Sequence, residues 1–434
     1  MIATLRILTT LLLALSGLHF VRINSPKAGS LSLPKMLAEA LIPYLTLLSV
    51  LGTLLGLALG DPWSVVAGVA GATISALHFW RAIAPHRGFE RAFGANWQAR
   101  LPPTQSKTML KRRWALRLPA SPQPRWERDL VFWRIPGTQR DLLCDLWQPP
   151  EGVIPTGLGI VFFHGSGWHF LDKDFGTRPF FRHLAAQGYV IMDVAYRMCP
   201  ETDFTGIIGD VKRAIAWMKS NSPRFGVDPE NIIAMGASAG GHMSLLAAYA
   251  PQDERMIPED VRGMDLAVKA VVSYYGPTDM RAYHQHAGRT MGFAEDNLPP
   301  KTPGPIDRVM NRMMDKLFKG KRYAITHRQM MKNLLGGQPD EVPEAYDLAS
   351  PVNYVSPQSP PTLLFQGEHD EIVPTTAART LYKKLVENNV PVIYVEFPQI
   401  EHAFDVAFRD LSQNSPAAQA ALYDVDRFLA LMAA

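Results

Sequence analysis

The chain has 434 residues, more than one domain usually holds, so we expect a large domain together with a smaller part. Hydrophobic residues make up 47% of the chain and the formal net charge is only +4, which argues against a disordered protein and against a nucleic-acid partner. The two cysteines, Cys144 and Cys199, lack both a CxxC spacing and the number needed for a disulfide framework, so we predict two small packed residues.

Three apolar segments open the chain. Residues 2–20 carry one charge, Arg6; residues 36–60 carry one, Glu39; residues 62–80 carry none. At a rise of about 1.5 Å per residue, the second and third segments are each long enough to cross the hydrocarbon core of a bilayer. The sequence therefore predicts a membrane region with two or three transmembrane helices.

The residues between and beside these segments support that prediction. Asp61-Pro62 interrupts the apolar pattern and predicts a tight helical hairpin, while Trp63 and Trp80 bracket the third segment as interfacial aromatic residues do. Small residues recur every four positions in the second segment, on a face where another helix could pack closely: Gly52, Gly56 and Gly60.

The distribution of charge predicts an orientation for this membrane region, which we place at residues 1–85. Basic residues lie in the first loop and after the third segment, whereas only Asp61 lies in the second loop. By the positive-inside tendency, the chain after Arg81 is cytoplasmic and the N-terminus is outside. Two alternatives remain: residues 2–20 also resemble a secretory signal, and the hairpin could be buried in a soluble protein. The basic residues of the first loop are Arg22, Lys27 and Lys35.

Residues 86–125 are predicted to form a basic, proline-rich linker. Such a segment would lie along the anionic inner leaflet of a membrane, or would simply be a solvated basic surface segment.

From about Arg125 onward, short apolar runs alternate with amphipathic stretches, which predicts a doubly wound, mostly parallel α/β sheet. In such a sheet, ligand sites form at the carboxyl ends of the strands. The expected strands are residues 130–135, 142–147, 159–163, 190–195, 232–235, 268–274, 363–366 and 392–397. The expected helices are residues 178–187, 207–219, 239–249, 375–387 and 416–432.

The fifth of these strands ends in a Gly-x-Ser-x-Gly pattern centred on Ser238. Gly236 and Gly240 lack Cβ atoms, so a strand and a helix can approach closely while the serine occupies a strained turn with its Oγ exposed. A serine placed in this way can serve as a nucleophile, although the pattern by itself is common.

Three further stretches follow strand ends. The turn His164–Trp168 is rich in glycine and exposes backbone N–H groups that could hold an oxyanion together with the N–H of Ala239. Asp370 follows a later strand and His402 follows the last one. The chain order serine, acid, histidine is the order expected of an α/β-hydrolase.

On these motifs, residues 126–434 resemble the α/β-hydrolase esterase/lipase group, which includes relatives of hormone-sensitive lipase and carboxylesterase or formamidase-like enzymes with a His-Gly-Gly-x-Trp-type oxyanion loop. The resemblance implies Ser238 as nucleophile, His402 as general base and Asp370 as its orienting acid, with no metal or organic cofactor. It implies an oxyanion hole made by the backbone N–H groups of Ser166, Gly167 and Ala239. Two residues depart from the pattern: Ser166 stands in place of a glycine, and Ala237 replaces an acid common in relatives of hormone-sensitive lipase.

Several neighbouring residues could take the same roles. His164 and Arg197 are predicted to support the loop and the strand ends. The alternative acids are Glu368, Glu371 and Asp405, and the alternative bases are His369 and His242.

Residues 280–332 form an insertion that is rich in methionine and basic residues. We expect a cap over the site that shapes a pocket and touches the bilayer, or else an ordinary packed helix with a solvated basic face.

The predicted function is that of a membrane-anchored serine hydrolase, a carboxylesterase for esters with an apolar acyl or alcohol part. An amide-cleaving formamidase or peptidase-like activity is the alternative within this class, and a catalytically silent binding module is the alternative outside it. The expected partners are a small-molecule ester and the lipid bilayer, with no nucleic acid; the oligomeric state stays open.

Overall fold

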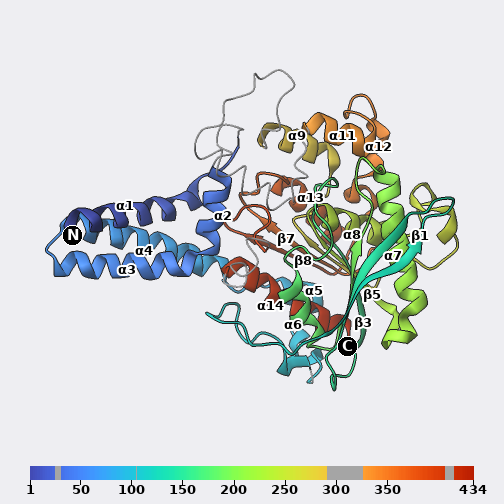
Figure 1. The fold of residues 1–434 in the computed structure, drawn as a ribbon, viewed down its shortest axis with the longest axis horizontal. Helices are drawn as coiled ribbons and strands as arrows, with labels where there is room; N and C mark the ends of the chain where they lie inside the picture. Colours follow the sequence, from blue (N-terminus) through green and yellow to red (C-terminus); the bar gives the residue numbers. More distant parts are fainter. Residues whose placement is uncertain (25–30, 104, 291–325, 406–414) are drawn as a thin grey trace.

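The computed structural model describes residues 1–24, 31–103, 105–290, 326–405 and 415–434. Figure 1 shows a bundle of helices that projects from one side of a larger α/β domain, with a short helix, α2, at the junction. Both cysteines are free and buried in the α/β domain, in agreement with the prediction of packed residues.

The α/β domain is built on one eight-stranded sheet in the order β1-β2-β4-β3-β5-β6-β7-β8. Strand β2 pairs antiparallel with both of its neighbours, and all other pairs are parallel. The eight strands coincide with the eight predicted apolar runs, so the predicted fold class is confirmed. The strands are β1 (Arg125–Arg134), β2 (Asp141–Gln148), β3 (Gly157–Phe163), β4 (Val190–Ala195), β5 (Val227–Ala237), β6 (Ala270–Tyr274), β7 (Thr362–Gly367) and β8 (Val392–Phe397).

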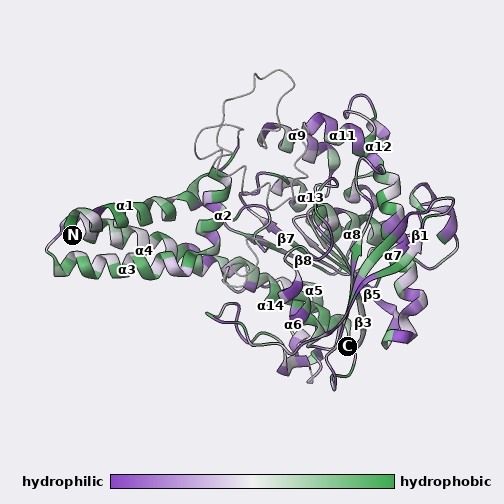
Figure 2. Ribbon diagram, in the orientation of Figure 1, coloured by the Kyte–Doolittle hydropathy of each residue, from purple (hydrophilic) through white to green (hydrophobic). Residues whose placement is uncertain are grey.

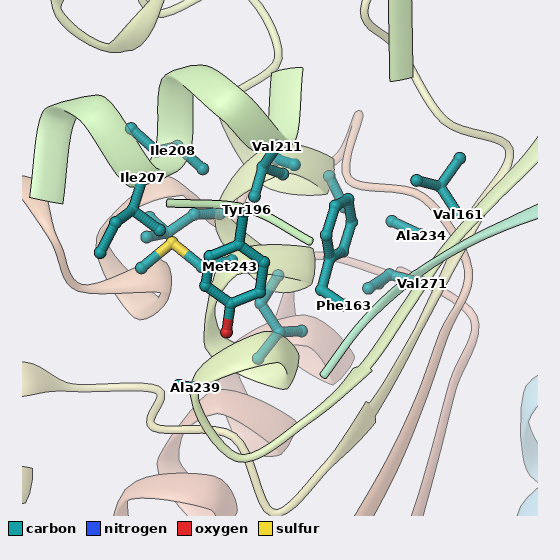
Figure 3. Packing of buried hydrophobic residues seen from close by; sticks show 14 of the residues in the cluster. Val161, Phe163, Tyr196, Ile207, Ile208, Val211, Ala234, Ala239, Met243 and Val271 are labelled. Atoms are coloured by element: carbon teal, nitrogen blue, oxygen red, sulfur yellow. The ribbon is translucent and has the colours of Figure 1, made fainter. Parts of the chain in front are cut away.

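Helices cover both faces of this sheet. In β3, Val161 and Phe163 belong to one hydrophobic cluster, whereas Ile160 and Phe162 belong to the cluster on the opposite face. Because successive side chains of a strand point to opposite faces, a strand buried on both sides reads as a continuous apolar run, as β3 does. Figure 3 shows Phe163 packed with residues of α7 and α8, among them Met243.

The helices of the α/β domain lie where the amphipathic stretches predict them. Each of the five predicted helices is present, and further short helices flank the insertion and the linker. The helices are α5 (Gly88–Phe93), α6 (Arg178–Ala185), α7 (Phe204–Phe225), α8 (Ala239–Tyr249), α9 (Met280–Thr290), α11 (His327–Leu335), α12 (Pro343–Leu348), α13 (Thr375–Glu387) and α14 (Pro416–Met432).

The projecting bundle consists of α1 (Ile2–Gly17), α3 (Ile42–Ala58) and α4 (Pro62–Ala82), and Figure 2 shows that many of its residues are hydrophobic. The predicted hairpin at Asp61-Pro62 is present. The Asp61 carboxylate caps α4 by accepting a hydrogen bond from the N–H of Ser64 at 3.3 Å. Proline suits the first turn of α4, where no intrahelical N–H bond is lost.

The glycines of α3 divide into two roles. A Cβ at Gly52 would lie 2.7 Å from the Thr9 side chain, and a Cβ at Gly56 would lie 2.9 Å from the Val65 backbone, so these two glycines let the helices approach. Gly60 has a positive φ of 63° and open space around it, and it ends the helix instead of packing against another one.

The second apolar segment is not one straight helix. The chain bends by 79° between α2 (Ser32–Ala40) and α3, so the predicted segment 36–60 begins on the α/β domain and only then enters the bundle. By length and composition, residues 2–20 and 62–82 are each long and apolar enough to cross a membrane, and a third crossing exists if α2 and α3 are counted together.

The predicted linker packs on the α/β domain. Arg113 pairs with Asp424 of α14 at 2.6 Å, and the backbone of Ala115 exchanges two hydrogen bonds with the Gln419 side chain at 2.7 and 2.8 Å. Phe89 of α5 is buried in the cluster that α14 covers. Arg113, one of the basic residues predicted to face a membrane surface, is therefore paired with the α/β domain.

Candidate active site

The serine of the Gly-x-Ser-x-Gly pattern stands at the sharp turn between β5 and α8. Ser238 has φ 52° and ψ −120°, a conformation that L-residues rarely adopt, and its N–H donates to the carbonyl of Tyr274 at 2.8 Å. This bond to the end of β6 holds the strained turn in place, and the residue is half-buried.

Two glycines make this turn sterically possible. A Cβ at Gly240 would lie 1.9 Å from the carbonyl oxygen of Phe163, and a Cβ at Gly236 would lie 2.5 Å from the backbone of Gly240. Both distances are far inside van der Waals contact, so β3, β5 and α8 converge only because these side chains are absent.

The structure brings Ser238, His402 and Asp370 together in one hydrogen-bonded relay. The Oγ of Ser238 lies 2.9 Å from Nε2 of His402, and Nδ1 of His402 lies 2.8 Å from Oδ2 of Asp370. An ionised carboxylate only accepts, so Nδ1 carries the proton and Nε2 is free to accept the serine proton.

Asp370 lies in a tight loop after β7 that surrounds its carboxylate with donors. Oδ1 accepts hydrogen bonds from the N–H groups of Ile372 and Val373 at 2.9 and 2.8 Å. Oδ2 accepts from the amide of Gln366 at 2.7 Å, in addition to the bond from His402. Four hydrogen bonds fill the lone-pair sites of the carboxylate and fix its orientation.

The glycine-rich turn after β3 packs directly on the serine turn. A Cβ at Gly165 would lie 3.1 Å from the carbonyl of Ala237 and 3.3 Å from Cβ of Ser238. Within the described ranges, no hydrogen-bond acceptor is recorded for the N–H groups of Ser166, Gly167 and Ala239. The oxyanion hole of these three N–H groups stays a prediction, which the packing of Gly165 on the serine turn supports.

The hydroxyl of Ser166 has a structural use. It lies 2.8 Å from the Tyr196 hydroxyl and accepts a hydrogen bond from the N–H of Trp168 at 3.0 Å. Tyr196 also donates to the carbonyl of His164 at 2.8 Å, so one tyrosine connects the first and the middle residue of the turn. The serine that replaces the usual glycine thus keeps its N–H and adds a tie within the loop.

The residues predicted to be structural supports make contacts of that kind. The His164 ring stacks on Tyr196 with a centroid separation of 4.6 Å, and burial lowers the pKa of His164 to about 4. Arg197 forms a two-pronged ion pair with Asp210 of α7 at 2.8 and 2.7 Å.

The three alternative acids make ion pairs or hydrogen bonds with other groups. Glu368 pairs with Arg22 at 2.8 Å, and Glu371 accepts a hydrogen bond from the hydroxyl of Ser32 at 2.8 Å. Asp405 accepts from the hydroxyl of the tyrosine that follows β6.

The two alternative bases are also engaged elsewhere. His242 donates from Nε2 to the carbonyl of Ala349 at 2.6 Å, and burial lowers its pKa to about 4. Nδ1 of His369 lies 2.9 Å from Nζ of Lys35. Neither ring has a recorded contact with the Ser238 hydroxyl.

Both described ends of the insertion reach the site. His286 of α9 lies 3.0 Å, through Nε2, from the carbonyl of Asp370, and Met330 of α11 lies 3.5 Å from the position of a Cβ at Gly167. The predicted cap is therefore in contact with the site at its two ends, while residues 291–325, which carry most of its basic and methionine residues, lie outside the described residues.

Sequence reasoning missed two residues of the site. Tyr275 places its ring 4.4 Å from that of His402, and Gln366 donates to Asp370. Both stand at the carboxyl end of a strand, as the predicted site residues do, so the positional rule that found Asp370 and His402 could have found them too.

The eight-stranded, mostly parallel sheet with a strained serine turn after β5 defines an α/β-hydrolase fold. More narrowly, the chain belongs to the BD-FAE family, whose profile matches residues 144–299 and 304–385, more than half of the sequence. The matched residues include Ser238 and Asp370 and end before His402.

Curated relatives include two proteins of Mycobacterium tuberculosis. The probable carboxylic ester hydrolase LipM is 32% identical over 66% of this chain and 57% of its own length. Esterase LipC is 28% identical over 64% of this chain and 60% of its own length. The chain thus spans less than two thirds of either relative.

Among solved structures, esterase 2 of Thermogutta terrifontis with bound butyrate superimposes with a TM-score of 0.51. The two proteins are 22% identical, and the match covers 73% of this chain and 96% of that chain. At this identity the likeness concerns the fold.

Proposed function

We propose that the chain is a membrane-anchored serine carboxylesterase that cleaves esters with an apolar acyl or alcohol part. The observation that carries the proposal is the relay from Ser238 through His402 to Asp370, with donors for an oxyanion beside the serine. The names of the relatives, an esterase and a probable carboxylic ester hydrolase, support the same reaction class.

In the proposed reaction, neutral His402 accepts the hydroxyl proton of Ser238 while Oγ attacks the ester carbonyl carbon. The oxyanion that forms accepts hydrogen bonds from backbone N–H groups among those of Ser166, Gly167 and Ala239. Imidazolium then protonates the departing alkoxide, and the alcohol leaves an acyl-serine.

The second half repeats the proton path with water. His402 removes a proton from a water molecule that attacks the acyl carbon, and it returns that proton to Oγ of Ser238 as the acid departs. Asp370 keeps Nδ1 protonated throughout and stabilises the imidazolium of each step.

The test is hydrolysis of p-nitrophenyl butyrate by the full chain in detergent, with labelling by a fluorophosphonate probe. Ser238→Ala is expected to lower kcat by about three orders of magnitude or more and to abolish labelling, because it removes the nucleophile. Ser220→Ala, an exposed serine of α7, is the control and should behave as wild type. Equal rates for wild type and Ser238→Ala would contradict the proposal.

We infer that the anchor is the bundle of α1, α3 and α4. Its outer face carries large apolar side chains that are half exposed or more, among them Leu54 and Trp80. The α/β domain lies beside the end of the bundle that holds Arg22 and Arg81, so the positive-inside tendency favours a cytoplasmic hydrolase. Protease treatment of inside-out and right-side-out vesicles tests this orientation, because a cytoplasmic α/β domain is accessible to protease only in the inside-out vesicles.

A further inference from the structure

Helix α2 lies at the junction of the bundle and the α/β domain (Figure 1), where it contacts the two loops that carry Asp370 and His402. Its Lys35 side chain is fully buried, with no exposed area, although lysine is almost never buried without a partner. Two of the three hydrogen-bond partners of this ammonium group come from these loops, one from each.

An ammonium group has three N–H donors, and each has an acceptor here. Nζ of Lys35 lies 2.7 Å from the carbonyl of Val21, 2.9 Å from Nδ1 of His369 and 2.6 Å from Oε1 of Glu401. His369 immediately precedes the acid of the relay, and Glu401 immediately precedes its histidine. Burial, together with the charge of Lys35, lowers the pKa of His369 to about 3, so the neutral ring can accept this bond.

Glu401 extends the connection on its other side. Its Oε2 accepts a hydrogen bond from the N–H of Glu371 at 3.1 Å, and its own N–H donates to Oε2 of Glu39 at 3.2 Å. One carboxylate thus ties the base loop to the acid loop, and two residues one turn apart on α2 hold that carboxylate and its backbone. We call Lys35, Glu39, His369 and Glu401 the α2 clamp.

The base loop needs such support because its backbone is strained. Gln399 and Ala403, on either side of His402, have φ of 61° and 58°, a region that non-glycine residues seldom occupy. Strained conformations of this kind persist only where the surrounding structure holds them.

The charges of the clamp depend on Lys35. Burial raises the pKa of Glu401, as do the nearby carboxylates of Glu39 and Glu371, whereas Lys35 opposes this increase. Without Lys35, the buried Oε1 of Glu401 would lose its hydrogen-bond donor, and a buried acceptor left without a donor destabilises the groups around it.

We propose that Lys35 is a positioning residue for the catalytic relay, acting through His369 and Glu401 on the loops of Asp370 and His402. The N-terminal region is then part of the hydrolase and not only its anchor. This inference rests on the proposed serine-hydrolase function.

The test uses the full chain in detergent with p-nitrophenyl butyrate, and rates are expressed per mole of protein in the monodisperse size-exclusion peak so that unfolded protein drops out. Lys35→Met is expected to lower kcat about tenfold or more with KM within about twofold, because the relay is misaligned while the ester pocket is intact. The double variant Lys35→Met/Glu401→Gln is expected to regain several-fold of that loss, because it removes the unpaired carboxylate and keeps an amide that can bond to both loops.

Arg6→Gln is the matched control. It removes an ion pair of 2.6 Å to Asp61 at the far end of the same bundle and should leave kcat at the wild-type value. A wild-type kcat in Lys35→Met overturns the inference, and so does a loss that Arg6→Gln shares or that the double variant does not recover. Ser238→Ala separates the two proposals: if it retains turnover, the serine-hydrolase function fails, whereas the clamp fails on the Lys35 variants alone.

Discussion

At the scale of single residues, the environment of Asp370 is the most constrained part of the candidate site. Its buried carboxylate accepts four hydrogen bonds, two from backbone N–H groups and two from the side chains of Gln366 and His402. Both oxygens of an ionised carboxylate are acceptors, so this group accepts from the N–H at Nδ1 of the imidazole. The identity of this residue therefore determines which nitrogen of His402 carries the proton.

Asp370→Asn is expected to lower kcat by about 10³–10⁴ because the amide can present N–H to Nδ1 and so favour the wrong tautomer. Steady-state hydrolysis of p-nitrophenyl butyrate measures the change. Glu387→Gln, at the exposed end of α13, alters an ion pair to Lys383 and should keep kcat within about twofold of wild type. Similar losses in both variants would contradict the assigned role of Asp370.

At the scale of elements, a buried polar cluster joins α6 to α14 and to the linker. Asp426 of α14 accepts hydrogen bonds from Gln187 at 2.8 Å and from the N–H of Leu110 at 2.8 Å, and it pairs with Nε2 of His183 at 2.8 Å. Burial lowers the pKa of His183, but the charge of Asp426 and its hydrogen bond outweigh burial and raise the pKa above its ordinary value. The carboxylate of Asp426 on α14 thus contacts α6, the residue Gln187 that follows it, and the linker.

This pair predicts a pH-dependent stability. In the unfolded chain, a histidine has a pKa of about 6.5. When its pKa is raised in the folded state, the histidine contributes its full stabilisation at pH values below about 6.5, and this stabilisation is lost as the pH rises through the pKa of the folded state. His183→Gln should therefore lower Tm more at about pH 5.5 than at about pH 8.5. Thermal unfolding of both proteins at the two pH values measures the difference.

His242→Gln is a control with the opposite sign. Burial lowers the pKa of His242 to about 4, so its neutral form contributes stability above about pH 6.5 that is lost as pH falls. The Tm penalty of this variant should be larger at the higher pH. If both variants change in the same direction with pH, the assignment of charge to the His183–Asp426 pair is wrong.

At the scale of the whole molecule, the chain joins an apolar bundle to an α/β domain through a polar interface. The bundle exposes leucines and valines that an aqueous environment would disfavour, whereas its end next to α2 is tied to the domain by charged residues. His78 of α4 adds a contact across the same interface, with Nδ1 lying 3.1 Å from the side-chain oxygen of Gln399. The base loop of the candidate site is therefore in contact with both α2 and α4.

Charges placed on the outer face of α3 should release the protein from membranes. Leu51→Arg/Leu54→Arg is expected to cost about 2.5–3.5 kcal/mol per charge at the centre of a spanning helix, and so to lower the fraction retained after carbonate extraction. The two leucines are 49% and 57% exposed. Val131→Arg/Val386→Arg changes residues of matched exposure, 53% and 49%, on the α/β domain and should be retained as wild type is. Equal retention of the two double variants would contradict the proposed anchor.

The sequence by itself determined the elements and the order of the relay. Apolar runs, amphipathic stretches and glycine sterics act over a few residues, so the eight strands and the turn at Ser238 were readable without the fold. The rule that sites form at the carboxyl ends of parallel strands then indicated the stretches that contain Asp370 and His402, and the family resemblance assigned these two residues their roles. A local pattern sufficed because each of these features depends on neighbours in the chain.

Only the tertiary structure decided how the N-terminal region meets the site. The apolar segment 36–60 looks continuous, but hydrogen bonds of Lys35 and Glu39 to Glu401 hold α2 on the α/β domain, and the chain bends after α2. Lys35 is 334 residues from His369 and 366 residues from Glu401. Contacts at such separations depend on how whole elements pack, so the periodicity of the sequence does not predict them.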